Sequence, residues 1–262
     1  MVIDTHCHLD KEDYENLDEI INNMKDNLMI ASGVDLKTSL NVIELCNKYD
    51  NIYGTIGYHP TELDEYTDDN LKIIEANLSN PKIVGIGEIG LDYHYGKENK
   101  DLQIKVFISQ LDLARKYKLP VVIHSRDAAE DTLEILKNYT DLKIDMHCFS
   151  YSKEIAKQLI KMGVKIGVGG VLTFKNSLKL KEIVNEIDLN NILLETDSPY
   201  LTPVPFRGQK NQPIYVKYVA EEIAKIKNIT IEEVEKITTL NAVSQFDLKL
   251  KKWYDFNILR GE

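Results

Sequence analysis

Histidine is the residue type in this chain best suited to chemistry, because its imidazole binds metals and gains or loses a proton near neutral pH. Each histidine lies at the end of a short apolar, β-branched run or a few residues beyond one. A single histidine in such a place is more often structural or solvated than a ligand. The placement of all the histidines in the same kind of position favours a metal site. They are His6, His8, His59, His94, His124 and His147.

Two carboxylates and the alternation of side chains along a strand extend this pattern. Glu88 and Asp197 also stand at the ends of such runs. His6 and His8 are two residues apart, so on a strand both side chains point to one face and Cys7 points to the other. Cys7 is therefore predicted to be a packing residue. Both carboxylates are predicted to face the same site as the two histidines.

The same alternation turns His124 and His147 inward at the ends of two later runs. Cys148 is then predicted to point outward against helices and to be inert. Four imidazoles and two carboxylates are more than one tetrahedral ion uses, and they suit two divalent ions that share a bridging carboxylate and water. Such mixed sites accept zinc, manganese, cobalt or magnesium, so the residue types leave the metal open.

The elements that must position these residues are eight short apolar runs with amphipathic helical stretches between them. This alternation predicts parallel strands joined by crossover helices, and eight strands favour a closed (β/α)₈ barrel, the TIM-barrel fold. A doubly wound open sheet is the alternative. In a barrel, catalytic groups come from the C-terminal ends of several strands. The runs are Val2–Leu9, Leu28–Val34, Ile52–Tyr58, Ile83–Ile89, Leu119–His124, Leu142–Cys148, Val164–Val168 and Ile192–Thr196.

Length and composition fit one domain over residues 1–262, with Lys249–Glu262 as a short surface extension after the last helix. Hydrophobic residues make up 43% and charged residues 28%, as in ordinary globular proteins. The sequence has no secretory signal or membrane span at its start, so a cytoplasmic protein is expected. Its three cysteines are then expected to be reduced. No obligate protein partner is indicated.

The formal net charge of −10 argues against a broad surface that grips phosphates, because such binding depends on clustered Lys and Arg. A nucleic-acid substrate would have to be held locally. Barrels often bind phosphate with the loops after strands seven and eight. In those loops Arg207 could fork onto phosphate oxygens, Lys175 could add charge and Phe174 could stack on a base. A solvated basic loop with one packed aromatic residue is the alternative.

Five segments around these residues resemble the TatD-type metal-dependent deoxyribonuclease family, whose members have an amidohydrolase-like barrel. The resemblance runs from residue 4 to beyond residue 210, and Asn241-Ala242 and Phe246 in the last helix add to it. The segments are Asp4-Thr5-His6-Cys7-His8-Leu9, Gly87-Glu88-Ile89-Gly90-Leu91-Asp92-Tyr93, His147-Cys148-Phe149-Ser150, Glu195-Thr196-Asp197-Ser198-Pro199-Tyr200-Leu201 and Pro203-Val204-Pro205-Phe206-Arg207-Gly208.

The resemblance implies that two divalent ions activate a bridging hydroxide for hydrolysis of a phosphodiester, as in a deoxyribonuclease. One ion would be held by His6, His8 and Asp197. The other would be held by His124 and His147, and Glu88 would bridge the two ions. Asp197 would also serve as the general base.

Three other residues bear on the site. Tyr151 stands where the family usually has glycine, and a bulky side chain beside a metal ligand bears on the shape of the substrate. Asp145 points into the barrel where an apolar residue is expected; it either orients a ligand through a hydrogen bond or has access to water near the start of its strand. Glu195 either supports Asp197 or belongs to a buried polar pair.

Two histidines remain outside the expected ligand set. His59 precedes Pro60 and is predicted to contact the substrate. His94 is either a substrate contact or a structural residue of its loop. Both lie on the same face as the expected ligands.

Two rival functions stay open. The same centre hydrolyses lactones, amides or phosphotriesters in other amidohydrolase-like barrels, and an acidic surface suits a small substrate. An inactive metal-bound scaffold is less consistent with a complete set of six ligands and a base. The Arg207 loop favours a phosphodiester, but the sequence does not distinguish DNA, RNA and a nucleotide as the substrate.

Overall fold

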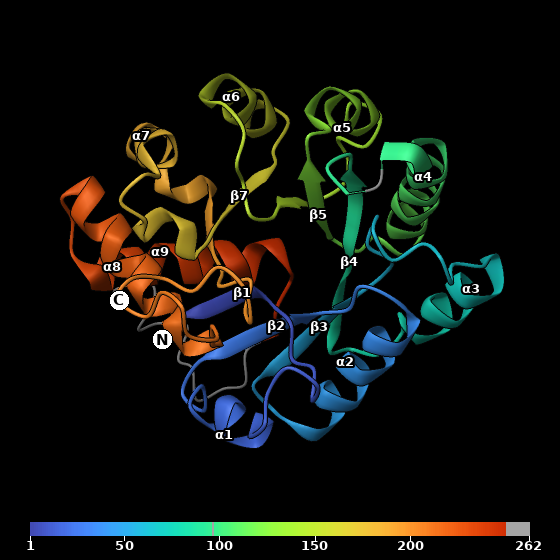
Figure 1. The fold of residues 1–262 in the computed structure, drawn as a ribbon, viewed down its shortest axis with the longest axis horizontal. Coiled ribbons are helices and arrows are strands. Elements are labelled where there is room, and N and C mark those ends of the chain that lie inside the picture. Colours follow the sequence, from blue (N-terminus) through green and yellow to red (C-terminus); the bar gives the residue numbers. More distant parts are fainter. Residues whose placement is uncertain (96, 250–262) are drawn as a thin grey trace.

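The computed structural model describes residues 1–95 and 97–249, and it confirms the (β/α)₈ barrel (Figure 1). Eight parallel strands of these residues follow one another around the sheet in chain order. Each strand overlaps one of the eight predicted runs. The strands are β1 (Ile3–Cys7), β2 (Leu28–Ser32), β3 (Ile52–Ile56), β4 (Ile83–Asp92), β5 (Val121–Arg126), β6 (Ile144–Met146), β7 (Lys165–Val168) and β8 (Ile192–Leu194).

The barrel closes where the end of β8 meets the end of β1. The N–H of Asp197 donates to the carbonyl of His6 at 3.0 Å, and the N–H of His8 donates to the carbonyl of Ser198 at 2.7 Å. These hydrogen bonds form just beyond the last residues of the two strands. The closure therefore places Asp197 beside His6 and His8, although about 190 residues separate them in the sequence.

Helices cover the outside of the strands (Figure 1). α2 shows how they begin: Asp35 accepts a hydrogen bond from the N–H of Thr38 at 2.7 Å, which satisfies a free donor of the first turn. The α-helices of the described residues are α1 (Leu17–Asn22), α2 (Leu36–Lys48), α3 (Asp68–Asn77), α4 (Lys100–Tyr117), α5 (Ala129–Leu136), α6 (Lys153–Lys161), α7 (Leu178–Glu186), α8 (Val216–Lys227) and α9 (Ile231–Gln245).

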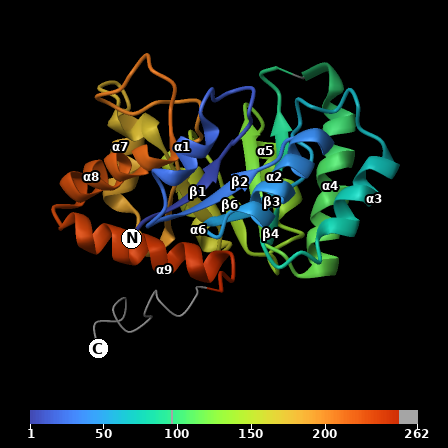
Figure 2. The ribbon, with the colours of Figure 1, turned by 90° about the horizontal axis from the view of Figure 1, so that it is seen from below.

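The last helix, α9, closes one end of the barrel. In Figure 2 it runs beneath the strands, close to the N-terminus. Val243 and Phe246 pack with Ile3, Val122 and Leu193 in a cluster of buried apolar side chains inside the barrel. Because this end is plugged, the opposite end, where the strands finish, is left as the place for a site.

Two further predictions concern the surroundings of the barrel. Within residues 1–95 and 97–249, no helix is both long enough and apolar enough to cross a membrane. The predicted C-terminal extension falls almost wholly on residues 250–262, which lie outside the described residues.

Candidate metal centre

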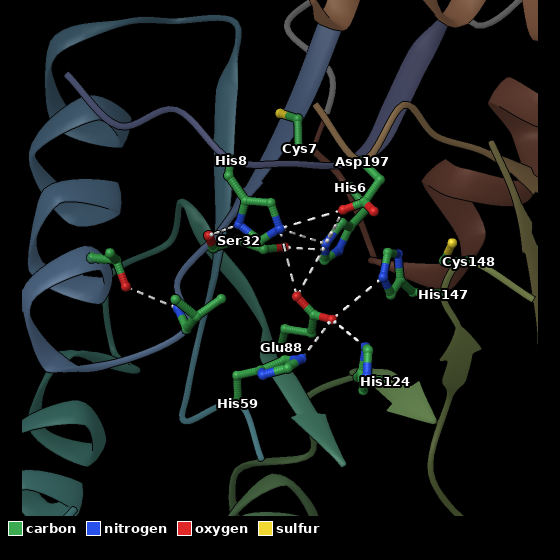
Figure 3. A network of polar contacts seen from close by, with 12 residues as sticks. His6, Cys7, His8, Ser32, His59, Glu88, His124, His147, Cys148 and Asp197 are labelled. Atoms are coloured by element: carbon green, nitrogen blue, oxygen red, sulfur yellow. Dashed lines mark hydrogen bonds and ion pairs between the residues drawn. The ribbon is translucent and has the colours of Figure 1, made fainter. Parts of the chain in front are cut away.

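The expected metal ligands and His59 gather around Glu88 at the C-terminal ends of the strands (Figure 3). Its two carboxylate oxygens face different groups of imidazoles. Oε2 lies 3.3 Å from Nε2 of His6 and 3.6 Å from Nε2 of His8. Oε1 lies 3.0 Å from Nδ1 of His124 and 3.3 Å from Nε2 of His147. One carboxylate therefore connects two sets of possible metal ligands.

Asp197 completes the set on the Oε2 side. Its Oδ1 lies 3.5 Å from Nε2 of His8 and 3.7 Å from Nε2 of His6. The ligand atoms of these three residues all lie within 4.8 Å of one another. A second group within the same limit consists of His6, Glu88 and His147, so the two sets adjoin.

His59 joins the site on the Oε1 side of Glu88. Its Nε2 lies 3.4 Å from that oxygen, and its ring packs edge-on against His124 with 4.3 Å between centroids. His59, Glu88 and His124 also bring their ligand atoms within 4.8 Å of one another. The structure therefore places the predicted substrate contact directly against the expected ligands.

Ser32, at the end of β2, backs the first pair of histidines. Its carbonyl lies 3.1 Å from Nδ1 of His8, so Nδ1 donates its proton there and Nε2 is the nitrogen that faces the carboxylates. Its hydroxyl lies 3.1 Å from Nδ1 of His6 and 2.8 Å from the hydroxyl of Thr55. The sequence analysis missed Ser32, although it ends a strand next to β1.

Asp92 backs His124 in the same way. Its Oδ2 lies 3.0 Å from Nε2 of His124, while Nδ1 of that ring faces Glu88. The carboxylate accepts the proton of Nε2 and leaves Nδ1 as the possible ligand atom. Asp92 was also missed. Its position four residues after Glu88 on the same strand puts both side chains on one face, and that signal could have found it.

The charges of the site fit cation binding. Burial alone would raise the pKa of Glu88, but the neighbouring imidazoles of His59, His147 and His6 hold it well below its ordinary value. For Asp197, burial is likewise outweighed by the hydrogen bond with His8 and by His147, and the pKa is lowered. Both carboxylates are therefore ionised at neutral pH.

The histidines divide into two groups. Burial lowers the pKa of His6 and of His147, so these rings are neutral at pH 7. Burial also acts against the charged form of His8 and His124, but their carboxylate partners raise both pKa values to about 9. A cation that binds His8 and His124 must displace these protons.

Glu195 lies behind His147. Its Oε1 accepts a hydrogen bond from the N–H of Cys148 at 2.7 Å and lies 3.4 Å from Nδ1 of His147, without the alignment of a hydrogen bond. Burial raises the pKa of Glu195 to about 8. The contacts thus fit a supporting role behind His147.

Both sequence interpretations of Asp145 are wrong. Its side chain is fully buried, which excludes access to water. Neither of its carboxylate oxygens has a hydrogen-bond partner within the described part of the chain, so it does not orient a ligand either. Burial, with Glu195 as the nearby like charge, raises its pKa well above the ordinary value.

The predicted outward direction of Cys148 is also wrong, whereas the prediction for Cys7 agrees with the structure. Cys7 is fully buried in the main core. The sulfur of Cys148 instead lies within 4.8 Å of the ligand atoms of His147 and Asp197. β6 ends at Met146 and Cys148 has a left-handed φ of 45°, so the alternation of a strand no longer applies. Burial raises the pKa of this thiol well above its ordinary value.

The predicted substrate contacts after β7 and β8 lie together. The guanidinium carbon of Arg207 is 3.8 Å from the centre of the Phe174 ring. Arg207 and Lys175 are exposed, and Phe174 is partly buried. His94 lies outside the cluster around Glu88 and contacts Asp127 at 3.0 Å.

This donor set fits divalent cations. It combines imidazole nitrogens with ionised carboxylates, and Ser32 and Asp92 turn the free nitrogens of His8 and His124 toward Glu88. Its residues come from β1, β4, β5 and the segments after β6 and β8. Such convergence is typical of a barrel active site.

The chain is similar to known proteins along nearly its whole length. The model of the family described as TatD related DNase matches residues 3–247. The uncharacterized metal-dependent hydrolase YabD of Bacillus subtilis is 44% identical over 252 residues, which cover 94% of this chain and 99% of YabD. The crystal structure of YjjV, a TatD homologue from Escherichia coli, has a TM-score of 0.88 at 28% identity and covers 95% of this chain and 98% of YjjV. The chain therefore belongs to the family of TatD related DNases.

Proposed function

We propose that this protein is a divalent-metal-dependent phosphodiesterase that cleaves DNA. The observation that carries the proposal is the placement of Glu88, whose two oxygens face two separate sets of ligands. One ion would be held by His6, His8 and Asp197, and the other by His124 and His147, with Glu88 shared between them. Two such ions, when bound, acidify a water and neutralise charge on the substrate; zinc, manganese and magnesium are the metals to test.

Asp197 is the proposed general base. Its carboxylate is partly buried and ionised at neutral pH, so it can accept a proton from water. It can then pass that proton toward the leaving oxygen, which is the usual task of a positioned carboxylate. The contact at 3.5 Å with Nε2 of His8 holds the carboxylate at the mouth of the barrel.

The proposed substrate contacts on the β7–β8 side are Arg207, Lys175 and Phe174. Packing against Phe174 limits the freedom of the guanidinium, which favours a fixed hydrogen-bond geometry toward phosphate. The chain carries a formal charge of −10, so its attraction for a polyanion must come from the ions and a few local cations. His59 would contact the substrate beside Glu88.

The experiment compares a phosphodiester with an uncharged lactone, in the metal-loaded wild type and in Arg207→Ala. We expect the variant to lose about ten- to a hundredfold in kcat/KM on the phosphodiester, because a charged donor to phosphate contributes about 1.5–3 kcal/mol. Lactone hydrolysis should not change. If the wild type hydrolyses only the lactone, the protein is a small-molecule hydrolase of the amidohydrolase type and the proposal is wrong.

A further inference from the structure

A second group of exposed planar side chains lies at the barrel mouth, beyond β4 and β5. Tyr95 is 67% exposed. The guanidinium carbon of Arg126 is 4.8 Å from the centre of its ring, and His94 packs edge-on against it at 4.7 Å and 89°. An aromatic face and a cation are therefore presented together to solvent.

This group is tied to the candidate metal centre. Oδ1 of Asp92 accepts hydrogen bonds from the N–H groups of His94 and Tyr95, at 2.8 and 2.9 Å. The other oxygen of the same carboxylate holds His124 at 3.0 Å. One buried residue thus fixes Tyr95 relative to a proposed metal ligand.

Tyr151 holds the segment that carries Arg126. Its hydroxyl lies 2.8 Å from the hydroxyl of Ser125 and accepts a hydrogen bond from the N–H of Ala128 at 3.2 Å. Arg126 and Asp127 lie between these two anchored positions. Tyr151 is therefore a positioning residue for Arg126, and its partly buried ring packs against the core.

The pair Tyr95–Arg126 has a counterpart on another side of the mouth. Arg207 packs on Phe174 in the segments after β8 and β7, whereas Tyr95 follows β4 and Arg126 is the last residue of β5. Around the barrel, β6 separates the two pairs on one side, and β1 to β3 separate them on the other. The ligands around Glu88 lie at the mouth that both pairs border.

We propose that Tyr95 and Arg126 form a nucleotide-binding subsite on the opposite side of the scissile phosphodiester from Arg207 and Phe174. Tyr95 would stack on a base and Arg126 would bind a phosphate of the same strand. A base can reach an exposed ring only when it is unstacked, so the substrate is a single strand long enough to span both pairs. This inference rests on the proposed phosphodiesterase function.

The carboxylate of Asp127, next to Arg126 in the chain, lies 3.0 Å from Nδ1 of His94 and is hydrogen-bonded within the group. Asp131, farther along the chain, is paired with Lys100 at 2.6 Å. Arg126 is therefore the residue of this group whose positive charge can bind a phosphate.

The test uses Tyr95→Ala and Arg126→Ala in the full chain, with Tyr117→Ala as the matched control. Tyr117 is 40% exposed on α4 and also lies beneath a cation, Lys116, at 5.2 Å. Each protein is assayed with manganese on a single-stranded oligodeoxynucleotide and on bis(p-nitrophenyl) phosphate, which is too small to reach the subsite. Binding of the labelled oligonucleotide is measured separately by fluorescence anisotropy.

We expect the two subsite variants to lose about five- to a hundredfold in kcat/KM on the oligonucleotide, mainly through KM, since one stacked base contributes about 1–3 kcal/mol. Oligonucleotide binding should weaken to the same degree. Hydrolysis of bis(p-nitrophenyl) phosphate should stay within about twofold of wild type, because the ions and Asp197 are untouched. Tyr95→Phe keeps the ring and should restore activity. Tyr151→Phe removes only the hydroxyl and should weaken oligonucleotide cleavage alone.

Equal losses on both substrates would overturn the subsite, and so would losses no larger than those of Tyr117→Ala. In either case the proposed function stands, because wild-type phosphodiester hydrolysis is measured in the same experiment. If the wild type binds the oligonucleotide through Tyr95 but hydrolyses no phosphodiester, the subsite is supported and the catalytic proposal fails.

Discussion

Asp92→Asn tests whether a hydrogen bond behind His124 decides which of its nitrogens can bind a cation. The oxygen of the new amide can keep the two hydrogen bonds from the N–H groups of His94 and Tyr95. Its NH₂ group then faces Nε2 of His124, where the carboxylate oxygen lies at 3.0 Å. Two donors cannot face each other, so the proton of the ring must move to Nδ1. That nitrogen lies 3.0 Å from Glu88 and is the proposed ligand atom.

Loss of such a supporting partner lowers metal affinity by about 10- to 100-fold, or about 1.4–2.7 kcal/mol. We expect calorimetric titration with zinc or manganese to show one weakened site and one site of unchanged affinity, because Ser32 still holds His6 and His8. Asp127→Asn is the control, since its exposed carboxylate contacts His94 and not a proposed metal ligand. Two sites of wild-type affinity, or equal weakening of both, would refute the tautomer argument.

Three further predictions follow from the site. Asp197→Asn should abolish turnover while circular dichroism stays unchanged, because the amide cannot accept a proton; most of the wild-type activity at saturating metal would contradict this. Asp145→Val should raise the melting temperature at pH 7 by about 2–6 °C, because a buried polar group without a partner costs about 1–3 kcal/mol. Because the pKa of Asp145 is raised in the folded state, its ionisation opposes folding above its ordinary pKa, so the gain in melting temperature should shrink as the pH falls toward 4. Calorimetry at pH 7 and pH 4 measures this gain. A gain that is the same at both pH values, or a loss, would contradict the prediction. Metal binding should release protons below pH 9 and weaken as the pH falls, since His8 and His124 have pKa values of about 9. Calorimetric titration in two buffers of different ionisation enthalpy measures the number of protons released, and a value of zero would contradict the prediction.

The fold could be predicted from the sequence because each strand of the barrel is a local feature. A buried parallel strand is a short apolar run, and eight such runs with helices between them admit few topologies. Side-chain alternation along β1 also predicted correctly that His6 and His8 face the site and Cys7 does not. The predicted direction of Cys148 was wrong because β6 ends two residues earlier, and the sequence pattern does not mark that boundary.

The supporting residues could not be predicted as easily, since their contacts join different strands. Ser32 reaches His6 and His8 only because β2 lies beside β1 in a particular register. Asp92 reaches His124 only because Gly90 on β4 pairs with His124 on β5. Alternation tells which face a side chain is on, but not which nitrogen of a neighbouring ring it will meet.

His59 differs from the proposed ligands in the contacts of its Nδ1. In His8 a carbonyl accepts the proton of Nδ1, so Nε2, which faces the carboxylates, is the nitrogen that a cation would bind after displacing its proton. In His59, Nδ1 lies 2.7 Å from the hydroxyl of Thr61 and 3.2 Å from its N–H, so Nδ1 has a partner whether or not it carries the proton. Burial lowers the pKa of His59 and keeps the ring neutral, and its Nε2 lies 3.4 Å from Glu88. With the proton on Nε2, His59 donates to Glu88 or to a substrate oxygen beside it, as a substrate contact requires; with the proton on Nδ1, Nε2 could bind a cation instead.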